Sequence, residues 1–256
     1  MESVLVAFSG GVDSSFLLKA SKDALGKNLL AVTACSAKMP ERDIKYATAL
    51  ARKLGVKHIL VQTRELLSSK FFNNNASRCY WCKKELYGRL KDIAKTRDLK
   101  YVIDGGNRDD TSDFRPGARA ALERGVRMPL KEARLTKAEI RTISKRLRLP
   151  TWKKPSFACL ATRIPYGTRI KEGMLKKIEK AENILQDAGF KGMRVRHHGD
   201  IARIEVEKAE MPKLLNPGKK DKIIKGLKNL GFTYVVADLE GYTRGSMNKL
   251  LNRKYK

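Results

Sequence analysis

The sequence predicts an α/β protein, a doubly wound parallel sheet followed by a smaller C-terminal α+β domain. Two observations predict this fold class. Between Val4 and Asp104, short apolar runs suited to buried strands alternate with helix-like patterns. From about Thr168 the pattern changes to short strands with helices beside them. The first pattern is typical of a parallel sheet with helices on both faces, and the second of a small α+β unit. We therefore expect domains at residues 1–165 and 166–256.

Four apolar runs are short enough, and rich enough in β-branched residues, to be buried strands. They are Val4–Phe8, Leu29–Cys35, His58–Thr63 and Tyr101–Asp104. Helical spacing between these runs predicts helices at Ser14–Leu25, Glu41–Leu54 and Lys83–Arg97. Strand, helix and strand in this order form right-handed crossovers, so the strands are expected to be parallel. Ligands of such sheets bind at the carboxyl ends of the strands.

The clearest sign of a ligand is the turn after the first strand, Ser9-Gly10-Gly11-Val12-Asp13-Ser14. Its glycines let the main chain approach phosphate oxygens closely, and the helix that follows presents free N–H groups at its positive end. The hydroxyls of Ser9 and Ser14 can donate further hydrogen bonds. The spacing fits neither the Walker motif nor the GxGxxG motif. A different kind of phosphate-binding loop is therefore predicted.

A long loop is expected after the third strand, and it contains the CxxC pair Cys79 and Cys82 just before the helix at Lys83. Two thiols at the mouth of a helix can bind one metal ion, and the helix dipole lowers their pKa. The loop after Asp104 carries a mixture of carboxylates and guanidinium groups. They belong to Asp109, Asp110 and Asp113, and to Arg108, Arg115 and Arg119. These groups suit Mg²⁺ and phosphate, although a solvated turn of mixed charge would have the same composition.

Thr136-Lys137-Ala138-Glu139 is a capping box that opens a helix to about Leu147. The loop from Pro155 to Gly167 then contains Cys159 beside Thr162 and Arg163. A single cysteine in an apolar segment usually packs in a core. The polar neighbours favour a functional role here.

The last part of the chain is expected to alternate helices and short strands. The helices are Glu172–Ala188 and Lys219–Leu230, and the strands are Met193–Arg196, Ala202–Glu207 and Thr233–Leu239. Arg194 and Arg196 would share one face of their strand, which is either solvated or an anion site. His197 and His198 would point to opposite faces, so we expect them to be structural and not metal ligands.

Composition narrows the function classes further. The 256 residues include 55 Lys and Arg against 27 Asp and Glu, a formal charge of +28 that favours anionic partners such as nucleotides or RNA. A generally basic proteome or a thermophile-type charged surface would give the same balance. The basic residues are spread along the chain, which disfavours nucleic acid. No apolar run is long enough to span a membrane, and no leader precedes the first strand, so we expect a cytoplasmic protein.

Seven segments together carry a family resemblance. They are SGGVDSSFL, RCYWCKKELY, DGGNRDDTSDFRPG, MPLKEARLTKAEIR, LPTWKKPSFACLATRIPYG, RVRHHGDIARIEV and DLEGYTRGSMN. In combination, over nearly the entire chain, they resemble the LarE family of the PP-loop ATP pyrophosphatase superfamily. LarE enzymes are the ATP-dependent sulfur transferases of nickel-pincer nucleotide cofactor synthesis. The resemblance implies that ATP adenylylates each carboxylate of pyridinium-3,5-biscarboxylic acid mononucleotide, with loss of pyrophosphate, before sulfur displaces AMP to leave a thiocarboxylate.

The resemblance also implies roles for particular residues. The pyrophosphate portion of ATP would be held by Ser9, Gly10, Gly11, Asp13 and Ser14. Asp13 would also help to hold Mg²⁺. Trp81 and Arg163 would line the substrate pocket, with Trp81 stacking on a pyridinium or adenine ring. Arg194 and Arg196 would bind the phosphate of the mononucleotide or of AMP, and Arg115 is a weaker candidate.

The source of sulfur is implied by the cysteines. In the family the cysteine equivalent to Cys159 supplies sulfur, and some members with that single cysteine sacrifice it and become dehydroalanine. Others have three cysteines, matching Cys79, Cys82 and Cys159 here, and resemble enzymes in which a [4Fe-4S] cluster keeps one iron open for hydrosulfide. All three are present, which favours the cluster. Zinc would call for a fourth ligand, and Cys35 is the only spare cysteine, at a position where the family usually has an acidic residue.

Other functions remain open at this stage. The first alternative is a [4Fe-4S]-dependent tRNA thiolation enzyme of the same superfamily, which the charge would suit, although no separate RNA-binding domain is visible. A nucleotide- or metal-binding regulator is a second alternative. An ammonia-using ligase is disfavoured, since it would leave the three cysteines unexplained. As partners we expect the pyridinium mononucleotide, a sulfide donor that the sequence does not identify, and further copies of the chain.

Overall fold

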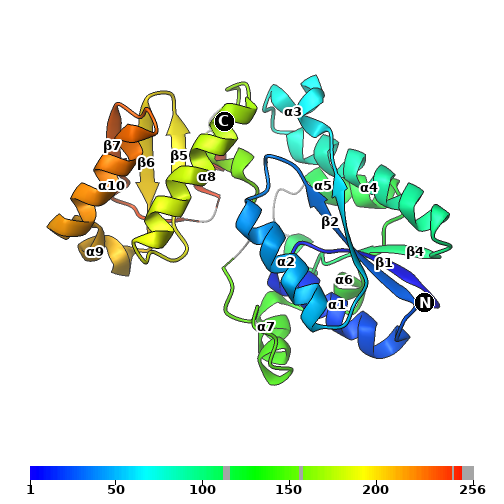
Figure 1. Ribbon diagram of the computed structural model, residues 1–256. Helices are drawn as coiled ribbons and strands as arrows, with labels where there is room; N and C mark the ends of the chain where they lie inside the picture. Colours follow the sequence, from blue (N-terminus) through cyan, green and yellow to red (C-terminus); the bar gives the residue numbers. More distant parts are fainter. Residues whose placement is uncertain (112–115, 156–157, 244, 250–256) are drawn as a thin grey trace. The chain divides into compact units, whose positions relative to one another are not determined.

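The structure is a computed structural model that describes residues 1–111, 116–155, 158–243 and 245–249 (Figure 1). It forms two compact units. The N-terminal unit comprises Met1–Phe71 and Ser77–Phe157, and the C-terminal unit comprises Phe72–Ala76 and Ala158–Lys256. The predicted domain boundary after residue 165 stays a prediction. The compact units divide after Phe157, so Cys159 belongs to the C-terminal unit.

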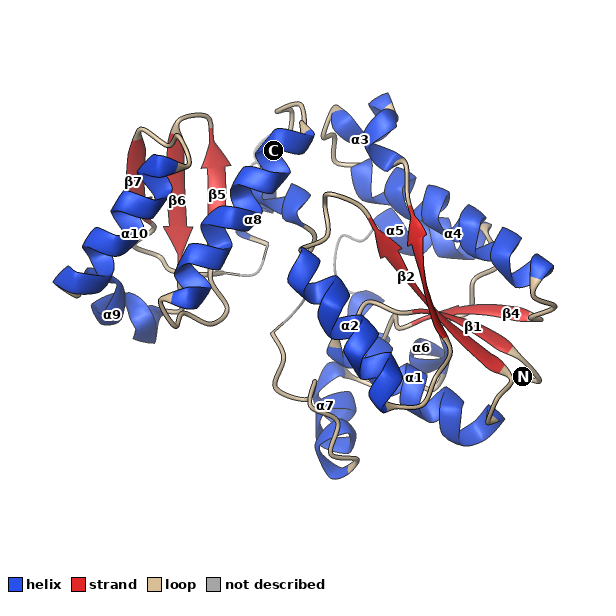
Figure 2. Ribbon diagram, in the orientation of Figure 1, coloured by secondary structure: helices blue, strands red, loops and turns tan. Residues whose placement is uncertain are grey.

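The N-terminal unit is built on a parallel sheet of four strands, drawn as red arrows in Figure 2. The strands are β1 (Val4–Ala7), β2 (Leu29–Cys35), β3 (His58–Gln62) and β4 (Tyr101–Asp104), in the order β3-β2-β1-β4. All three pairings are parallel. The predicted fold class, a doubly wound parallel sheet, is confirmed.

Helices cover both faces of this sheet because the strands are apolar on both sides. Val4, Leu5 and Val6 are fully buried, and successive side chains point to opposite faces. Val4 and Val6 pack in a core that also contains Phe16 of helix α1, whereas Leu5 packs with Tyr87 of helix α4 on the other side. The helices of the unit are α1 (Val12–Leu25), α2 (Glu41–Lys53), α3 (Ser69–Phe72), α4 (Arg78–Thr96), α5 (Pro116–Glu123), α6 (Pro129–Glu132) and α7 (Lys137–Arg146).

The order of the strands fixes where a ligand can bind. From β1 the chain runs outward to β2 and β3 in one direction, and β4 is added on the other side of β1. The carboxyl end of β1 therefore lies at the topological switch point of the sheet, where doubly wound folds hold their ligands. The Ser9–Ser14 turn begins two residues past the end of β1.

The C-terminal unit contains a second sheet with the order β5-β6-β7. Its strands are β5 (Arg194–His198), β6 (Ile201–Glu205) and β7 (Tyr234–Ala237), and its helices are α8 (Glu172–Asp187), α9 (Met211–Leu215) and α10 (Pro217–Asn229). β5 is antiparallel to β6, and β6 is parallel to β7. One face packs against α8 and α10 around Val195, Ile204 and Leu227. This is the predicted small α+β unit.

Short 3-10 turns complete the described structure, at Glu65–Leu67, Arg108–Thr111, Leu160–Arg163, Lys208–Glu210 and Ser246–Asn248. Within the described ranges, no helix has the combination of length and apolar character that crossing a membrane requires.

One sequence expectation is wrong. The CxxC pair was expected in a loop before a helix at Lys83, but α4 begins at Arg78 and contains both cysteines in its first turns. Tyr80 explains the difference, because it is 6% exposed and lies seven residues before Tyr87, at the helical spacing that continues through Leu90 and Ala94 in the same core. The helical spacing of buried residues therefore extends further towards the N-terminus than the expected start.

Candidate active site

The turn after β1 adopts a conformation that only glycine fits well at its second position. Gly10 has a φ of +67°, and a Cβ built there would lie 3.0 Å from the Cβ of Ala47 in α2. The main chain thus passes close to α2 before it enters α1 at Val12. Both constraints explain why the turn carries glycine at this point.

Hydroxyl groups close the turn on itself. The N–H of Ser9 donates to Oγ of Ser14 at 3.3 Å, and the two hydroxyl oxygens are 3.1 Å apart. The N–H of Gly11 donates to Oγ of Ser9 at 3.4 Å. These distances lie at the long end of the range for hydrogen bonds, so the bonds are weak. The same donors can exchange them for hydrogen bonds to a phosphate oxygen at small cost. The predicted phosphate loop therefore has its donors gathered at one point.

The chain that leaves β4 packs directly against this turn. A Cβ on Gly105 would lie 2.9 Å from the backbone nitrogen of Ser14, so only glycine lets the two segments approach so closely. Asn107, which is 3% exposed, donates from Nδ2 to Oδ1 of Asp13 at 3.2 Å. Two strand ends, those of β1 and β4, therefore build one site.

Two lysines that sequence reasoning missed also contact the turn. Lys137 is the first residue of α7, after the confirmed capping box of Thr136 and Glu139, and its Nζ forms an ion pair with Oδ2 of Asp13. Lys154 donates from Nζ to the carbonyl oxygen of Gly10 at 3.3 Å. Both lysines lie in segments that carry the family resemblance, which is the only signal that could have singled them out.

The carboxylates of Asp109 and Asp110, expected to hold Mg²⁺, bind the backbone of the residues that contact Asp13. Oδ2 of Asp109 accepts the backbone N–H of Lys137 at 2.9 Å, and Oδ2 of Asp110 accepts the backbone N–H of Asn107 at 3.2 Å. These two side chains therefore shape the loop after β4. Asp113 and Arg115 lie outside the described residues.

Cys79 and Cys82 occupy the first turns of α4. Residues three apart on a helix lie on the same side, roughly 5–6 Å apart at Cβ, so the pair fits two ligand positions of one metal ion or cluster. Both cysteines are half-buried, as is Cys159, which lies in the C-terminal unit. Within the described ranges no three His, Cys, Asp or Glu side chains gather in a way that would hold a metal ion.

Next to the CxxC pair, Lys83 reaches the carboxyl end of β4. Its Nζ lies 2.9 Å from Oδ2 of Asp104, and the hydroxyl of Tyr87 donates to the same oxygen at 3.0 Å. Burial opposes the charge of Asp104, but the charge of Lys83 together with hydrogen bonds from Lys83, Tyr87 and the Gly106 N–H holds the pKa of the carboxyl below its usual value. Lys83 and Asp104 thus remain a charged pair that ties α4 to the strand end.

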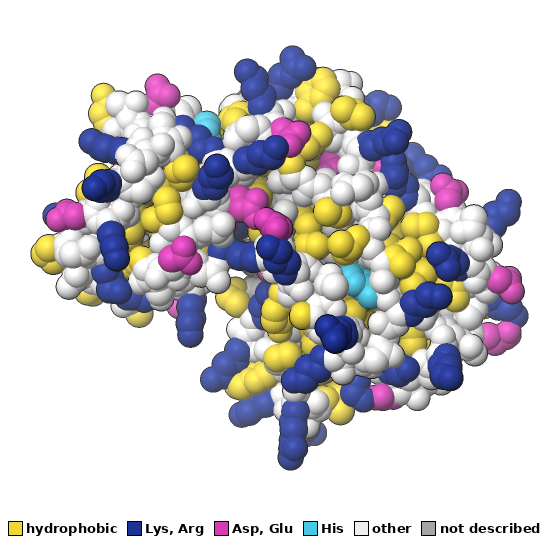
Figure 3. Space-filling model, viewed as in Figure 1, with side chains coloured by type: hydrophobic (Ala, Val, Ile, Leu, Met, Phe, Trp, Pro, Cys, Tyr) yellow, Lys and Arg dark blue, Asp and Glu magenta, His cyan; other side chains and the backbone are white. Residues whose placement is uncertain are grey.

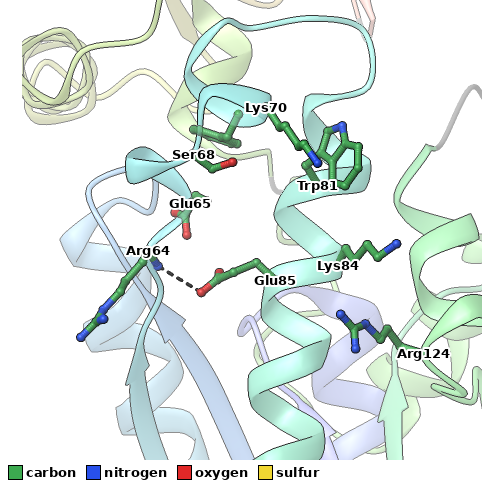
Figure 4. A pocket seen from close by; sticks show the side chains of 9 residues that line it. Arg64, Glu65, Ser68, Lys70, Trp81, Lys84, Glu85 and Arg124 are labelled. Atoms are coloured by element: carbon green, nitrogen blue, oxygen red, sulfur yellow. Dashed lines mark hydrogen bonds between the residues drawn. The ribbon is translucent and has the colours of Figure 1, made fainter.

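Trp81 lines a cavity of about 370 Å³ in the N-terminal unit (Figure 4). The lining residues are Arg64, Glu65, Ser68, Lys70, Phe71, Trp81, Lys84, Glu85 and Arg124. Nζ of Lys70 lies 3.9 Å from the centroid of the Trp81 ring. Four basic side chains beside an aromatic ring suit an anionic, planar ligand. Whether Trp81 stacks on substrate stays a prediction.

The Cys159 loop is held by a buried arginine. Nη1 of Arg163 donates to the carbonyl oxygens of Ala158 and Cys159 at 2.8 and 3.1 Å. The rest of the guanidinium group pairs with both carboxylate oxygens of Glu182 in α8, at 2.8 and 3.0 Å. Burial disfavours both charges, but each is stabilised by the other, which raises the pKa of Arg163 and lowers that of Glu182. Arg163 therefore fixes the backbone on either side of the Cys159 peptide.

Arg194 and Arg196 are buried, at 8% and 4% exposed, so their face of β5 is not a solvated one. Nη2 of Arg196 lies 2.6 Å from Oε2 of Glu205, and its Nη1 donates to the carbonyl oxygen of Thr162 at 3.0 Å. Burial and the charge of Arg163 lower the pKa of Arg194. The expected anion-binding role of the two arginines stays a prediction. On the opposite face His197 is buried and contacts Phe232, as expected of a structural residue.

The fold and the site define a class of protein, since a glycine and serine turn at the switch point of a doubly wound sheet is the site of an enzyme that acts on a nucleotide phosphate. The comparisons agree. Residues 1–92 match the family model described as NAD synthase, which supports a PP-loop domain and the use of ATP.

The particular family follows from full-length relatives. The pyridinium-3,5-bisthiocarboxylic acid mononucleotide synthase of Lactiplantibacillus plantarum is 37% identical over 255 residues, 99% of this chain and 91% of that protein. An uncharacterized protein of Synechocystis is 40% identical over 99% of this chain and 94% of its own. Another, from Methanocaldococcus jannaschii, is 30% identical over 94% and 91%. The chain belongs to the family of the mononucleotide synthase, the LarE family.

Proposed function

We propose that the protein is an ATP-dependent sulfur transferase that converts the carboxylates of pyridinium-3,5-biscarboxylic acid mononucleotide to thiocarboxylates. The observation that carries this proposal is the turn at the end of β1, with Asp13 bound by Asn107 and Lys137, in a chain 37% identical to the mononucleotide synthase. Such a turn suits the phosphates of ATP, and Asp13 would share a Mg²⁺ ion with them.

The first half of the reaction makes a leaving group. An oxygen of the substrate carboxylate attacks the α-phosphorus of ATP, and the bond from that phosphorus to the bridging oxygen of pyrophosphate breaks. Ser9, Gly10, Gly11 and Ser14 hold the phosphates through backbone N–H groups and hydroxyls. In the second half, sulfur attacks the carbonyl carbon of the adenylate and AMP departs with the electron pair.

Cys159 is our candidate for the residue that delivers sulfur. Its loop is fixed by Arg163, which supports a role that needs a defined sulfur position. We further propose that Cys79, Cys82 and Cys159 hold a [4Fe-4S] cluster, which would supply an open iron for hydrosulfide and allow repeated turnover. The placement of Cys79 and Cys82 on one side of α4 supports it, and zinc or sacrifice of Cys159 are the competing accounts.

Substrate contacts are proposed from the surroundings of each residue. Trp81 lines a basic cavity, which supports stacking on the pyridinium ring of an anionic substrate. Arg194 and Arg196 remain our candidates for the phosphate of the mononucleotide or AMP. Arg163 is already bound to Glu182 and two carbonyl oxygens, which supports a role in holding the Cys159 loop more than one in direct substrate contact.

One observation favours a second candidate, thiolation of tRNA, and it is the formal charge of +28. Against it, Lys and Arg side chains are scattered over the visible face and do not gather in one stripe (Figure 3). Binding of tRNA that weakens steeply with salt, together with tRNA-dependent AMP release, would support this candidate.

The main proposal is tested by incubating the anaerobically purified protein with ATP, Mg²⁺ and the pyridinium dicarboxylate mononucleotide, and by measuring AMP and pyrophosphate. Both products should appear only when the substrate is present. Cleavage of ATP to ADP and phosphate, or release of AMP that ignores the substrate, would contradict the proposal. Iron analysis of the same sample tests the cluster, which predicts about four irons per chain.

A further inference from the structure

Lys137 stands out because it joins a helix start to the carboxylate of the phosphate loop. Its Nζ pairs with Oδ2 of Asp13, while Oδ1 of the same carboxylate accepts a hydrogen bond from Asn107. The two side chains are 26% and 22% exposed, so a ligand at the loop can reach both. The residues that connect them all belong to the N-terminal unit.

The position of the ammonium group is well defined. Lys137 opens α7, whose start is fixed by the capping box of Thr136 and Glu139 and by the bond from the Lys137 N–H to Asp109. α7 packs against α1, and its Ile140 is fully buried in the core to which α1 also contributes. A rigid helix therefore delivers one flexible cation to the phosphate loop.

The charges explain what this cation can do. Asp13 is an anion in the first turn of α1, next to the backbone N–H groups that would bind phosphate. Left alone, its charge would repel ATP, and Lys137 neutralises it while no nucleotide is bound. Asp13 would be the ligand for a Mg²⁺ ion bound with ATP, and the ammonium group of Lys137 would then be free to contact the phosphates.

Lys154 differs in this respect. Its Nζ bonds the carbonyl oxygen of Gly10 and also lies 3.0 Å from Oδ1 of Asp43 in α2. The Gly10 carbonyl oxygen and the Asp43 carboxylate together hold Lys154 in place. Its contacts hold the loop against α2 and leave Lys137 as the lysine whose partner the metal ion would take.

We propose that Lys137 is a catalytic residue of the adenylylation step. Its ammonium group exchanges Asp13 for the β-phosphate of ATP and stabilises the departing pyrophosphate. This inference rests on the first half of the proposed function. As the bond between the carboxylate oxygen and the α-phosphorus forms, the bond to the bridging oxygen breaks and its electron pair stays on pyrophosphate. Lys137 takes no part in bond making or breaking and supplies positive charge where negative charge develops.

The test compares Lys137→Gln and Lys137→Arg with Lys145→Gln, a control that removes the same charge from an exposed position near the end of α7. Exchange of labelled pyrophosphate into ATP, in the presence of the pyridinium substrate, reports the adenylylation step. We expect Lys137→Gln to lower the exchange rate about 100-fold or more, with partial rescue in Lys137→Arg and no change in Lys145→Gln. Thermal unfolding should stay close to wild type in all three.

A second readout keeps this inference separate from the proposed function. Binding of Mg²⁺ and an ATP analogue with a methylene group between the α- and β-phosphates is measured by calorimetry, without the pyridinium substrate. Lys137→Gln should weaken it about tenfold, and Lys145→Gln should not. If Lys137→Gln binds the analogue and exchanges pyrophosphate as well as the wild type does, the inference is overturned. If the wild type binds the analogue but catalyses no exchange, the proposed function fails, and the binding result alone decides the role of Lys137.

Discussion

The buried pair of Glu182 and Arg163 offers a prediction whose magnitude follows from the structure. Glu182 and Arg163 are 1% and 3% exposed, and the guanidinium group contacts both carboxylate oxygens. Oε1 of Glu182 also accepts the backbone N–H of Val195 in β5 at 3.1 Å. Glu182→Ala therefore leaves a buried positive charge without its partner and removes an acceptor from a buried backbone group.

Removal of one partner from a buried ion pair costs about 3–5 kcal/mol, so we expect a loss of this size in the C-terminal unit. Calorimetry of thermal unfolding is the assay, because it resolves units that unfold separately. Glu172→Ala, in the same helix, breaks an exposed pair with Lys176 and should cost less than about 1 kcal/mol. A loss below about 1 kcal/mol in Glu182→Ala as well would refute the reasoning.

A double variant at Arg163 and Glu182 can distinguish an effect on stability from an effect on activity. Replacing both partners by apolar residues, in Arg163→Met with Glu182→Leu, should restore part of the stability, since the Arg163 charge is removed together with its partner, while Arg194 and the N–H of Val195 still lose Glu182. It should not restore sulfur transfer, because the carbonyl oxygens of Ala158 and Cys159 lose their common donor. Full activity in a stable double variant would show that the loop needs no such support.

The same pair makes the stability of the unit depend on pH. Burial opposes the charge of Glu182, but the charge and hydrogen bonds of Arg163, with Arg194 and the Val195 N–H, lower the pKa of Glu182 from its ordinary 4.5. The contribution of the pair is therefore complete above this ordinary value and is lost as the pH falls through the lowered pKa of the folded state. Acid should destabilise the wild type more than Glu182→Gln, which has no such proton to gain.

The remaining predictions concern the loop and the cysteines. Gly105→Ala should cost about 1–3 kcal/mol and weaken ATP binding, because its Cβ would lie 2.9 Å from the backbone of Ser14, and equilibrium unfolding with calorimetric titration checks both. Gly88→Ala, where a Cβ meets only the end of the Arg124 side chain at 3.8 Å, is the matched control and should not destabilise. Cys159→Ala should abolish thiocarboxylate formation but spare ATP binding, and retained transfer would remove it from the site. Cys79→Ala should lose iron and repeated turnover if a cluster is used, and should retain one turnover per chain if Cys159 is sacrificed.

Much of the fold could be predicted because its signals are local. Each strand of the first sheet is a short apolar run, and each crossover helix repeats its buried positions at helical spacing. The start of α4 was missed because Tyr80, a buried position, belongs to a segment that also carries the cysteines and looks like a loop by composition. The cysteines drew attention to metal binding, and the helical periodicity of this segment was not recognised.

The phosphate turn could also be predicted from its own residues, but its partners could not. Lys137 contacts Asp13 across 124 residues of sequence, and no local pattern distinguishes it from the other lysines of a basic chain. Likewise, the resemblance implied that Arg163 lines the substrate pocket, which stays a prediction, but nothing in the sequence pointed to its partner Glu182 in helix α8. Long-range charge pairs depend on tertiary packing, which a pattern in one segment does not contain.

The most direct test of the central claim is mass spectrometry of the pyridinium mononucleotide after reaction with the protein, ATP, Mg²⁺ and sulfide under anaerobic conditions. The account predicts product in which sulfur replaces one oxygen of each carboxylate, with one AMP and one pyrophosphate released for each sulfur introduced. Unchanged mononucleotide in the presence of a protein that binds ATP, or sulfur incorporation without AMP release, would contradict it.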